Sequence, residues 1–322
     1  MRVSISLAGG TQELGRVDPA RLADFGFASL FLGCYEDDMR WRAEETASFI
    51  RRARTRGMTC VATPWGYGKV LDPDPSVSSL YVETHPQTLQ LDSRGRRVPK
   101  ACPNDPYFLE WFSSNMRTLA WMLEVEGFLW DEPSFHYARG HWACRCEYCQ
   151  RLFHASLGFE LPRDFNEKVV DFRERSLVMF VLAAAAAIQS VDAKLQSLVM
   201  PAPAMPGTPV HGGTGNWGAL AACSACDVLS LFVPWQHNDV PMGQAIRELQ
   251  TEGGKHVSRY GKRHILWVAA SPSPRDRILE ALPVAAEAGV ENLVLADYGS
   301  LFEAPHFDRI EADLRRVIAQ VT

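Results

Sequence analysis

The chain has 322 residues, of which 47% are hydrophobic, and its formal net charge is −5 at pH 7. This composition supplies a large apolar core, and the negative balance argues against a nucleic-acid-binding surface. No uninterrupted apolar run reaches the ~18 residues that a membrane span needs, and the N-terminus lacks the layout of a signal peptide. We therefore expect a cytoplasmic protein whose eight cysteines are reduced or metal-bound.

Eight short apolar runs predict β-strands, because most are continuous and rich in β-branched residues, as in strands buried on both faces of a parallel sheet. They are Val3–Leu7, Ser29–Leu32, Thr59–Thr63, Phe128–Trp130, Ser197–Met200, Val228–Val233, Ile265–Ala269 and Asn292–Ala296. Helical patterns lie between them, at Trp41–Arg56, Pro106–Val125, Asp164–Ala193, Met242–Gly261, Pro274–Ala288 and Phe307–Val321. The alternation predicts a single (β/α)8 TIM-barrel domain over residues 1–322, with a doubly wound open sheet as the alternative.

The active sites of such barrels lie where the strands end. Aromatic and acidic residues follow several of the predicted strands, a mixture that suits a sugar, because rings stack on its apolar faces and carboxylates bind its hydroxyls. The residues that we expect to line a sugar site are Trp65, Tyr67, Trp235, Trp267, Asp297 and Tyr298. Alternatively, the aromatic rings only fill the barrel mouth. The long connection Pro64–Pro103 has weak predicted structure of its own, and loops of that length are usually functional.

Two adjacent carboxylates, Asp131 and Glu132, end the fourth predicted strand. Their mutual repulsion, together with burial against Trp130 and Phe135, would raise the pKa of one of them. An acid that stays protonated near neutral pH can protonate a leaving-group oxygen. The alternative interpretation is an ordinary solvated turn or helix cap.

Three cysteines follow at close spacing, Cys144, Cys146 and Cys149. A structural zinc site needs a fourth ligand, for which Cys102, His141, Cys223 and Cys226 are candidates. Cys102 would join the long loop after the third strand to the loop that carries the acids. We expect a structural zinc, because four sulfur ligands leave no open position for a substrate.

These motifs together resemble the catalytic barrel of the family-42 β-galactosidases. The ordered match covers residues 84–153 and consists of "THPQTLQLDSRGRRVPKACPNDPYF", then "WDE", then "CRCEYCQRLF". The resemblance implies that Glu132 is the general acid/base and that Cys102, Cys144, Cys146 and Cys149 bind zinc. Asp131 stands where the family has Asn.

The chain departs from this family at the seventh strand, where "ILWVAASPSP" offers no carboxylate in the place of the family's nucleophile. A retaining mechanism needs two carboxyl groups about 5–5.5 Å apart. Another acid near a strand end would serve instead: Asp297, Asp239, Glu36, Asp37 or Asp38. Alternatively, Asp131 orients the substrate or assists a 2-acetamido nucleophile, since the pair is similar to the Asp-Glu pair of the substrate-assisted hexosaminidases.

We therefore expect a glycosidase whose substrate is a small molecule or an oligosaccharide. The chain possesses no sequence signal that decides whether it forms a homo-oligomer. The main alternative is a catalytically inactive carbohydrate-binding barrel or scaffold protein. A metal-dependent hydrolase or isomerase is a weaker alternative, because only His237 lies beside an acid, Asp239, at a predicted strand end. A phosphate-binding role for the glycine-rich loop His211–Gly218 is disfavoured, because the loop lacks a Lys at the required spacing.

Overall fold

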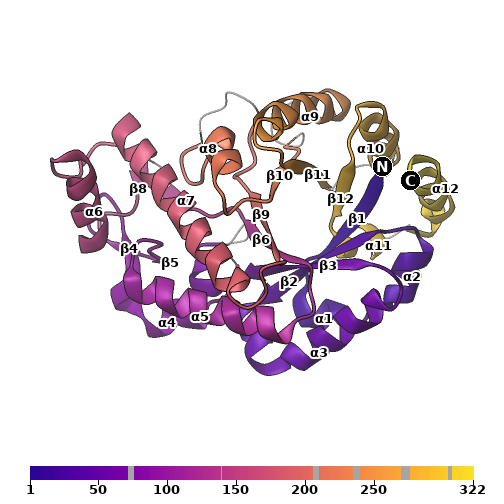
Figure 1. Ribbon diagram of the computed structural model, residues 1–322, viewed down its shortest axis with the longest axis horizontal. Helices are drawn as coiled ribbons and strands as arrows, with labels where there is room; N and C mark the ends of the chain where they lie inside the picture. The colour runs from indigo at the N-terminus through magenta and orange to yellow at the C-terminus, as the bar shows by residue number, and fades with distance from the viewer. Residues whose placement is uncertain (72–75, 139, 206–209, 235–239, 270–275, 304–306) are drawn as a thin grey trace.

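A computed structural model describes residues 1–71, 76–138, 140–205, 210–234, 240–269, 276–303 and 307–322. Its eight parallel strands close into a barrel in the order β1-β12-β11-β10-β9-β6-β3-β2 (Figure 1). They are β1 (Arg2–Leu7), β2 (Ser29–Tyr35), β3 (Thr59–Trp65), β6 (Gly127–Asp131), β9 (Gln196–Met200), β10 (Val228–Phe232), β11 (Arg263–Ala269) and β12 (Asn292–Ala296). The prediction of a TIM barrel is confirmed, each of the eight apolar runs forms a strand, and the open sheet is excluded.

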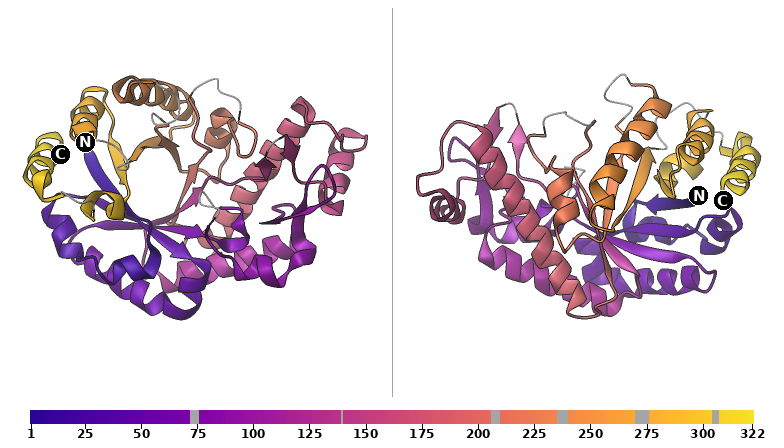
Figure 2. Two further views of the ribbon diagram at one scale, coloured as in Figure 1. Left: turned by 180° about the vertical axis from the view of Figure 1, so that it is seen from behind. Right: turned by 45° about the horizontal axis from the view of Figure 1, so that its top comes forward.

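Helices surround the barrel on its outside (Figures 1 and 2). The longer ones are α3 (Glu36–Arg54), α5 (Pro106–Met122), α6 (Glu147–Leu157), α7 (Glu167–Gln189), α9 (Met242–Ser258), α10 (Asp276–Glu287) and α12 (Glu311–Val321). The short ones are α1 (Gly10–Leu14), α2 (Pro19–Asp24), α4 (Leu80–Thr84), α8 (Trp217–Ala222) and α11 (Tyr298–Phe302), with 3-10 turns at Tyr67–Lys69, Pro86–Thr88 and Phe307–Arg309. All six predicted helices are present in the structure, with shifted ends.

Local capping explains where the helix boundaries differ from the sequence prediction. α3 begins at Glu36 rather than Trp41, because three acids stand in its first turn, where the helix dipole favours negative charge. α7 begins only at Glu167, because the Asn166 side chain accepts a hydrogen bond from the Val169 amide and caps the helix there. α5 is capped by Asp105, whose side chain accepts hydrogen bonds from the Tyr107 and Phe108 amides.

The long connection after β3 is more ordered than we expected. It contains α4 and an antiparallel hairpin of β4 (Leu89–Leu91) and β5 (Arg97–Ala101). A second hairpin, β7 (Tyr137–Ala138) with β8 (His141–Trp142), lies near it. With α6, these hairpins form a lobe at one side of the barrel (Figure 2).

The buried side chains form three clusters. Outward-facing strand residues pack under the helices, and inward-facing residues such as Phe31, Leu129 and Trp267 fill the barrel interior. The third cluster belongs to the lobe and includes Phe135 and Phe153. The lobe therefore shares an apolar core with Val169, Phe172 and Leu177 of α7.

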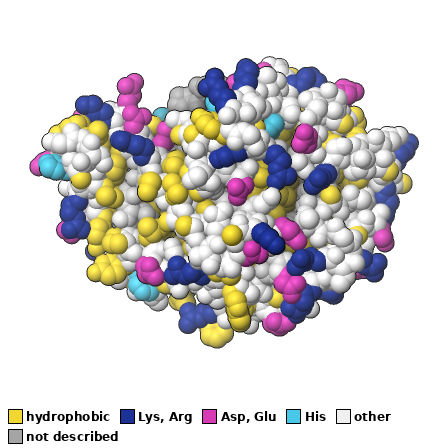
Figure 3. All heavy atoms as spheres, viewed as in Figure 1, with side chains coloured by type: hydrophobic (Ala, Val, Ile, Leu, Met, Phe, Trp, Pro, Cys, Tyr) yellow, Lys and Arg dark blue, Asp and Glu magenta, His cyan; other side chains and the backbone are white. Residues whose placement is uncertain are grey.

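Two surface properties bear on the expected partners. None of the described helices is long and apolar enough to cross a membrane. On the face shown in Figure 3, basic and acidic side chains are interspersed, and neither sign dominates that face.

Candidate active site and cysteine cluster

Asp131, the last residue of β6, points into the barrel mouth. It has the same strand parity as Leu129, which lies in the interior cluster, and its side chain is buried. Its Oδ2 atom accepts a hydrogen bond of 2.9 Å from Nε1 of Trp65, at the end of the adjacent strand β3. Its Oδ1 atom is buried and has no hydrogen-bond partner among the described residues. Burial raises the pKa of Asp131 to about 7, although the Trp65 hydrogen bond opposes the rise.

Glu132 interrupts the alternation of inward-facing and outward-facing side chains along β6. Its φ angle of 46° lies in the left-handed region, which costs a residue other than glycine of the order of 1–3 kcal/mol. Its amide nevertheless donates a 3.0 Å hydrogen bond to the Met200 carbonyl, which continues the pairing with β9. The change of backbone direction allows the carboxyl groups of Glu132 and Asp131 to interact. Burial and the charge of Asp131 raise the pKa of Glu132 to about 8.

Lys100 supplies positive charge beside this acid. It lies on β5, its Nζ atom donates a 2.6 Å hydrogen bond to Ser134 Oγ, and its charge partly lowers the pKa of Glu132. From the sequence, Lys100 was only one of several basic residues on the long loop. The hairpin brings Lys100 close to Glu132, although the two residues are 32 positions apart in the sequence, and no local motif predicts this proximity.

The hairpin is hydrogen-bonded to the segment that follows the acids. Gln90 donates to the Ala101 carbonyl within the hairpin and accepts from the His136 amide, both at 2.9 Å. An isolated β-bridge joins Leu71 to Pro133. These bonds hold the residues after Glu132 against the loop after β3.

Four cysteines meet in the lobe. The Sγ atoms of Cys102, Cys144, Cys146 and Cys149 all lie within 4.8 Å of one another. The Sγ–Sγ distance is 3.5 Å for Cys102–Cys149 and 3.6 Å for Cys102–Cys146, close to the ~3.8 Å edge of a tetrahedron with Zn–S bonds of ~2.3 Å. Among the described residues, this buried cluster is the one group of thiols that could hold a metal ion.

Polar donors surround the sulfur atoms as they do in metal–thiolate sites. The backbone amides of Leu91 and Cys146 donate hydrogen bonds to Cys144 Sγ, with N···S distances of 3.4 and 3.3 Å. The Asn104 side chain donates from Nδ2 to Cys149 Sγ at 3.3 Å. Such bonds stabilise thiolates and orient them.

Arg173 of α7 provides independent evidence on whether the four sulfur atoms carry negative charge. Its side chain is 3% exposed, and its Nε and Nη1 atoms have no hydrogen-bond partner among the described residues. Burial lowers the pKa of Arg173 to about 10, and the charges of Cys144 and Cys149 oppose this effect. A buried guanidinium needs a nearby negative charge, and four thiolates around a divalent cation carry a net charge of −2. The cluster therefore fits a bound metal better than four neutral thiols.

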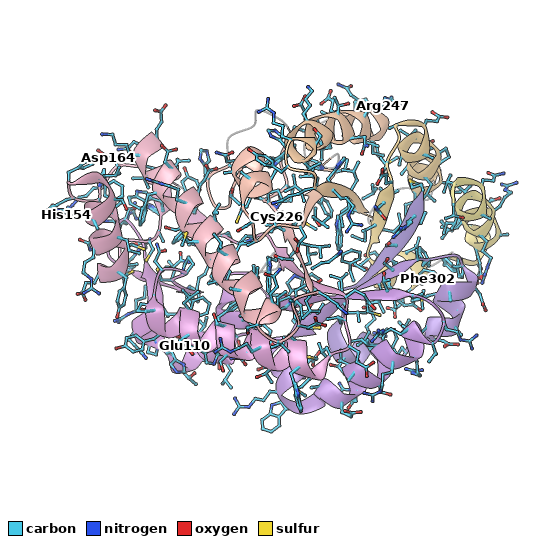
Figure 4. The ribbon with its side chains drawn as sticks, viewed as in Figure 1. Glu110, His154, Asp164, Cys226, Arg247 and Phe302 are labelled. Atoms are coloured by element: carbon cyan, nitrogen blue, oxygen red, sulfur yellow. The ribbon has the colours of Figure 1, made fainter. Side chains whose placement is uncertain are left out.

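The other candidate ligands are not part of this group of sulfur atoms. His141 lies on β8 in the same lobe, and Cys226 lies beside α8 (Figure 4). Cys223 and Cys226 follow α8, and both are buried free thiols.

The aromatic residues expected around the site fall into different environments. Trp65 is at the mouth, where it binds Asp131, and Trp267 lies inside the barrel with its ring centroid 4.7 Å from that of Phe31. Tyr67 and Tyr298, which we expected to line the sugar site, are both buried in the helix-facing cluster. Tyr67 packs against Phe112 of α5, and Tyr298 stacks on Phe302 of α11. Trp235, His237 and Asp239 lie outside the described residues.

Most of the candidate second acids have local partners. Glu36 accepts hydrogen bonds from Ser79 Oγ and the Tyr81 amide, Asp37 accepts from Ser78 Oγ, and Asp38 accepts from the Thr11 amide. These three acids therefore anchor neighbouring loops.

Asp297 caps α11 by accepting a 2.7 Å bond from the Ser300 amide. Its strand, β12, lies opposite β6 in the ring of eight. The sequence analysis missed Glu13, a buried acid just after β1 whose pKa is raised to about 7, first by burial and further by Asp297 and Glu303. Its position soon after the first predicted strand was the sequence signal that could have identified Glu13.

Solved structures resemble this chain in fold. Two β-galactosidases, from Halorubrum lacusprofundi and from Bacillus circulans sp. alkalophilus, each give a TM-score of 0.72 at 14% and 12% identity. Each match covers 100% of this chain, but 58% and 56% of the respective enzyme. A GH20 exo β-N-acetylglucosaminidase from Vibrio harveyi gives 0.56 at 11% identity, covering 99% of this chain and 53% of the enzyme.

The chain thus spans little more than half of the length of these proteins, and at these identities the likeness shows the fold alone, a TIM barrel. No protein-family model matches the chain, and no curated protein matches it.

Proposed function

We propose that the protein is a glycoside hydrolase in which Glu132 is the general acid/base. The observation that carries this proposal is the pair of interacting carboxyl groups at the C-terminal end of β6, of buried Asp131 and half-buried Glu132. Because the pKa of Glu132 is raised to about 8, this acid holds its proton at neutral pH and can deliver it to a glycosidic oxygen. The fold shared with glycosidases supports the substrate class.

Asp131 would bind and orient the substrate. Its Trp65 bond fixes the carboxyl group, and its second oxygen has no partner among the described residues, so that oxygen is free to accept a hydrogen bond from a bound sugar. β11 carries no carboxylate at its end, and the sequence from Ala270 to Arg275 adds none. A nucleophile within the substrate removes the need for one.

The reaction that fits is substrate-assisted hydrolysis of a 2-acetamido glycoside. Asp131 would accept a hydrogen bond from the acetamido N–H while the acetamido oxygen attacks C1 of the sugar. The C1–O bond to the leaving group breaks, and that oxygen takes the proton of Glu132. Glu132 then removes a proton from the water that attacks C1 and opens the cyclic intermediate.

The cysteine cluster would hold a structural zinc ion through Cys102, Cys144, Cys146 and Cys149. The metal would supply no step of the reaction and would act as a cross-link between β5 and the loop before α6. Lys100 is two residues before Cys102, so this cross-link would also fix the cation beside Glu132.

The test compares 4-nitrophenyl glycosides with and without a 2-acetamido group. We expect turnover of the 2-acetamido substrates, and a loss of about 10²–10⁴-fold in Glu132→Gln. Glu83→Gln, at an exposed position on α4, is the matched control and should retain full turnover. Equal turnover by Glu132→Gln and the wild type would contradict the assignment, whereas hydrolysis confined to substrates without the acetamido group would contradict only the substrate-assisted route.

A carbohydrate-binding barrel without catalysis is the second candidate. The absence of a carboxylate at the end of β11 favours it, because the family-42 β-galactosidases that the sequence resembles have their nucleophile there, and a retaining mechanism needs two carboxyl groups. This candidate predicts sugar binding by calorimetry, with no turnover by the wild-type protein on any substrate of the panel.

A further inference from the structure

A cavity of about 480 Å³ opens at the end of the barrel opposite the acids. It is lined by the first residues of the strands, including Arg2 of β1, Ser29 of β2 and Thr59 of β3. Asp131 is at the other end of β6, and strands of five to seven residues place the two openings roughly 15–20 Å apart. The cavity is therefore separate from the candidate active site.

The floor of the cavity is apolar. Phe31, Ile265 and Val294 line it, and all three belong to the cluster that fills the barrel interior. The volume is within the ~300–1,000 Å³ typical of small-molecule pockets.

The rim of the cavity is basic. Four cations, Arg2, Arg54, Lys194 and Arg263, surround the opening, against two acids, Glu126 and Asp192. This local excess of positive charge contrasts with the net charge of −5 of the whole chain.

The acids leave most of these cations unpaired. Glu126 pairs with Arg54 at 3.4 Å and also accepts the Cys60 amide at 2.6 Å, and Asp192 accepts the backbone amide of Lys194. Among the described residues, the side chains of Arg2, Lys194 and Arg263 have no carboxylate within ion-pair distance.

Two of these cations are held by the sheet. Arg2 pairs with Asn292 of β12, and Arg263 begins β11 on the other side of that strand. Their backbones are thus fixed two strands apart, on either side of Asn292, which also lines the cavity. An anion between them would receive charge-assisted hydrogen bonds from both.

We propose that this cavity binds a small organic anion, with its apolar part on the Phe31, Ile265 and Val294 floor and its anionic group between Arg2 and Arg263. The proposal does not depend on the glycosidase assignment, because it concerns the opposite end of the barrel.

Isothermal titration calorimetry with 2-naphthyl phosphate tests this site. Inorganic phosphate lacks the apolar part and 2-naphthol lacks the charge, so we expect each to bind at least about tenfold more weakly. Binding should also weaken as NaCl rises, because exposed rim charges are screened.

The variants Arg263→Gln and Arg2→Gln should each weaken 2-naphthyl phosphate binding by about tenfold. Arg175→Gln, the same change at an exposed position of α7, is the matched control and should bind as the wild type does. Thermal midpoints would confirm that all three variants fold. The proposal is overturned if the wild type does not bind the probe at millimolar concentration, if inorganic phosphate binds as tightly, or if the rim variants bind like Arg175→Gln.

Discussion

The pH dependence of hydrolysis should follow the pKa values of the acidic pair. In the proposed reaction, the reactive form would have Glu132 protonated and Asp131 ionised. With the pKa of Asp131 raised to about 7 and that of Glu132 to about 8, kcat/KM should be bell-shaped with limbs near these values. Because the two groups interact, the limbs belong to the pair.

The variant Asp131→Asn removes one negative charge beside Glu132. The pKa of Glu132 is raised from 4.5 to about 8, first by burial and second by this charge. The carboxyl group stays buried in the variant, so the alkaline limb should move down by about 1 pH unit, equivalent to about 1.4 kcal/mol, and should stay well above 4.5. The acidic limb should disappear together with the group that causes it.

Lys100→Met should move the alkaline limb in the opposite direction, because the cation that favours ionised Glu132 is lost. The assay is kcat/KM on a nitrophenyl 2-acetamido glycoside between pH 5 and 10, with Glu83→Gln as the control. An alkaline limb that is the same in the wild type and both variants would refute the assignment of Glu132 as the acid.

The remaining predictions concern stability and the metal. A carboxyl group whose folded pKa is raised favours the folded state at low pH. This stability is lost as pH rises from 3.8 to about 7 for Asp131 and from 4.5 to about 8 for Glu132. The double variant Asp131→Asn/Glu132→Gln should therefore melt at a higher temperature than the wild type at pH 9, with a smaller difference at pH 4. Elemental analysis should find about one zinc per chain in the wild type and in Cys223→Ser, and little in Cys102→Ser, whose thermal midpoint should also fall. Arg173→Met should lose zinc faster to a chelator than the wild type, because the charge that offsets the four thiolates is gone, and equal rates would contradict its role.

The barrel could be predicted from the sequence because its strands are buried on both faces, so each is a nearly continuous apolar run. The hairpin β4–β5 could not, since a three-residue strand paired with a five-residue strand has little local signal and is stabilised by distant partners. Cys102, whose amide donates to the Thr88 carbonyl, and Gln90, which bonds to His136, hold it in place. Helix ends were missed where a cap or first-turn acids outweighed the apolar pattern.

For the site, position along the chain was predictable, but side-chain direction was not. Asp131 and Glu132 stand where the end of the fourth strand predicted them, and the four cysteines converge. Tyr67 and Tyr298 also follow strands, yet they turn into the helix layer, because residues beyond a strand no longer obey its alternation. The left-handed backbone of Glu132 could not be inferred either, since this conformation is uncommon for a residue other than glycine and no local motif signals it here.

The cysteine cluster and the acid are connected through β5. Cys102 lies in the cluster, Lys100 two residues earlier is the cation beside Glu132, and the Cys144 loop holds the other hairpin strand through the Leu91 amide. Removing the metal would free this hairpin and, with it, the position of Lys100. We therefore expect chelated protein to keep its acid but to show an alkaline limb of kcat/KM shifted upward, as in Lys100→Met, and adding a chelator to Lys100→Met should cause no further shift. An additional shift in that variant would mean that the metal acts on Glu132 by another route.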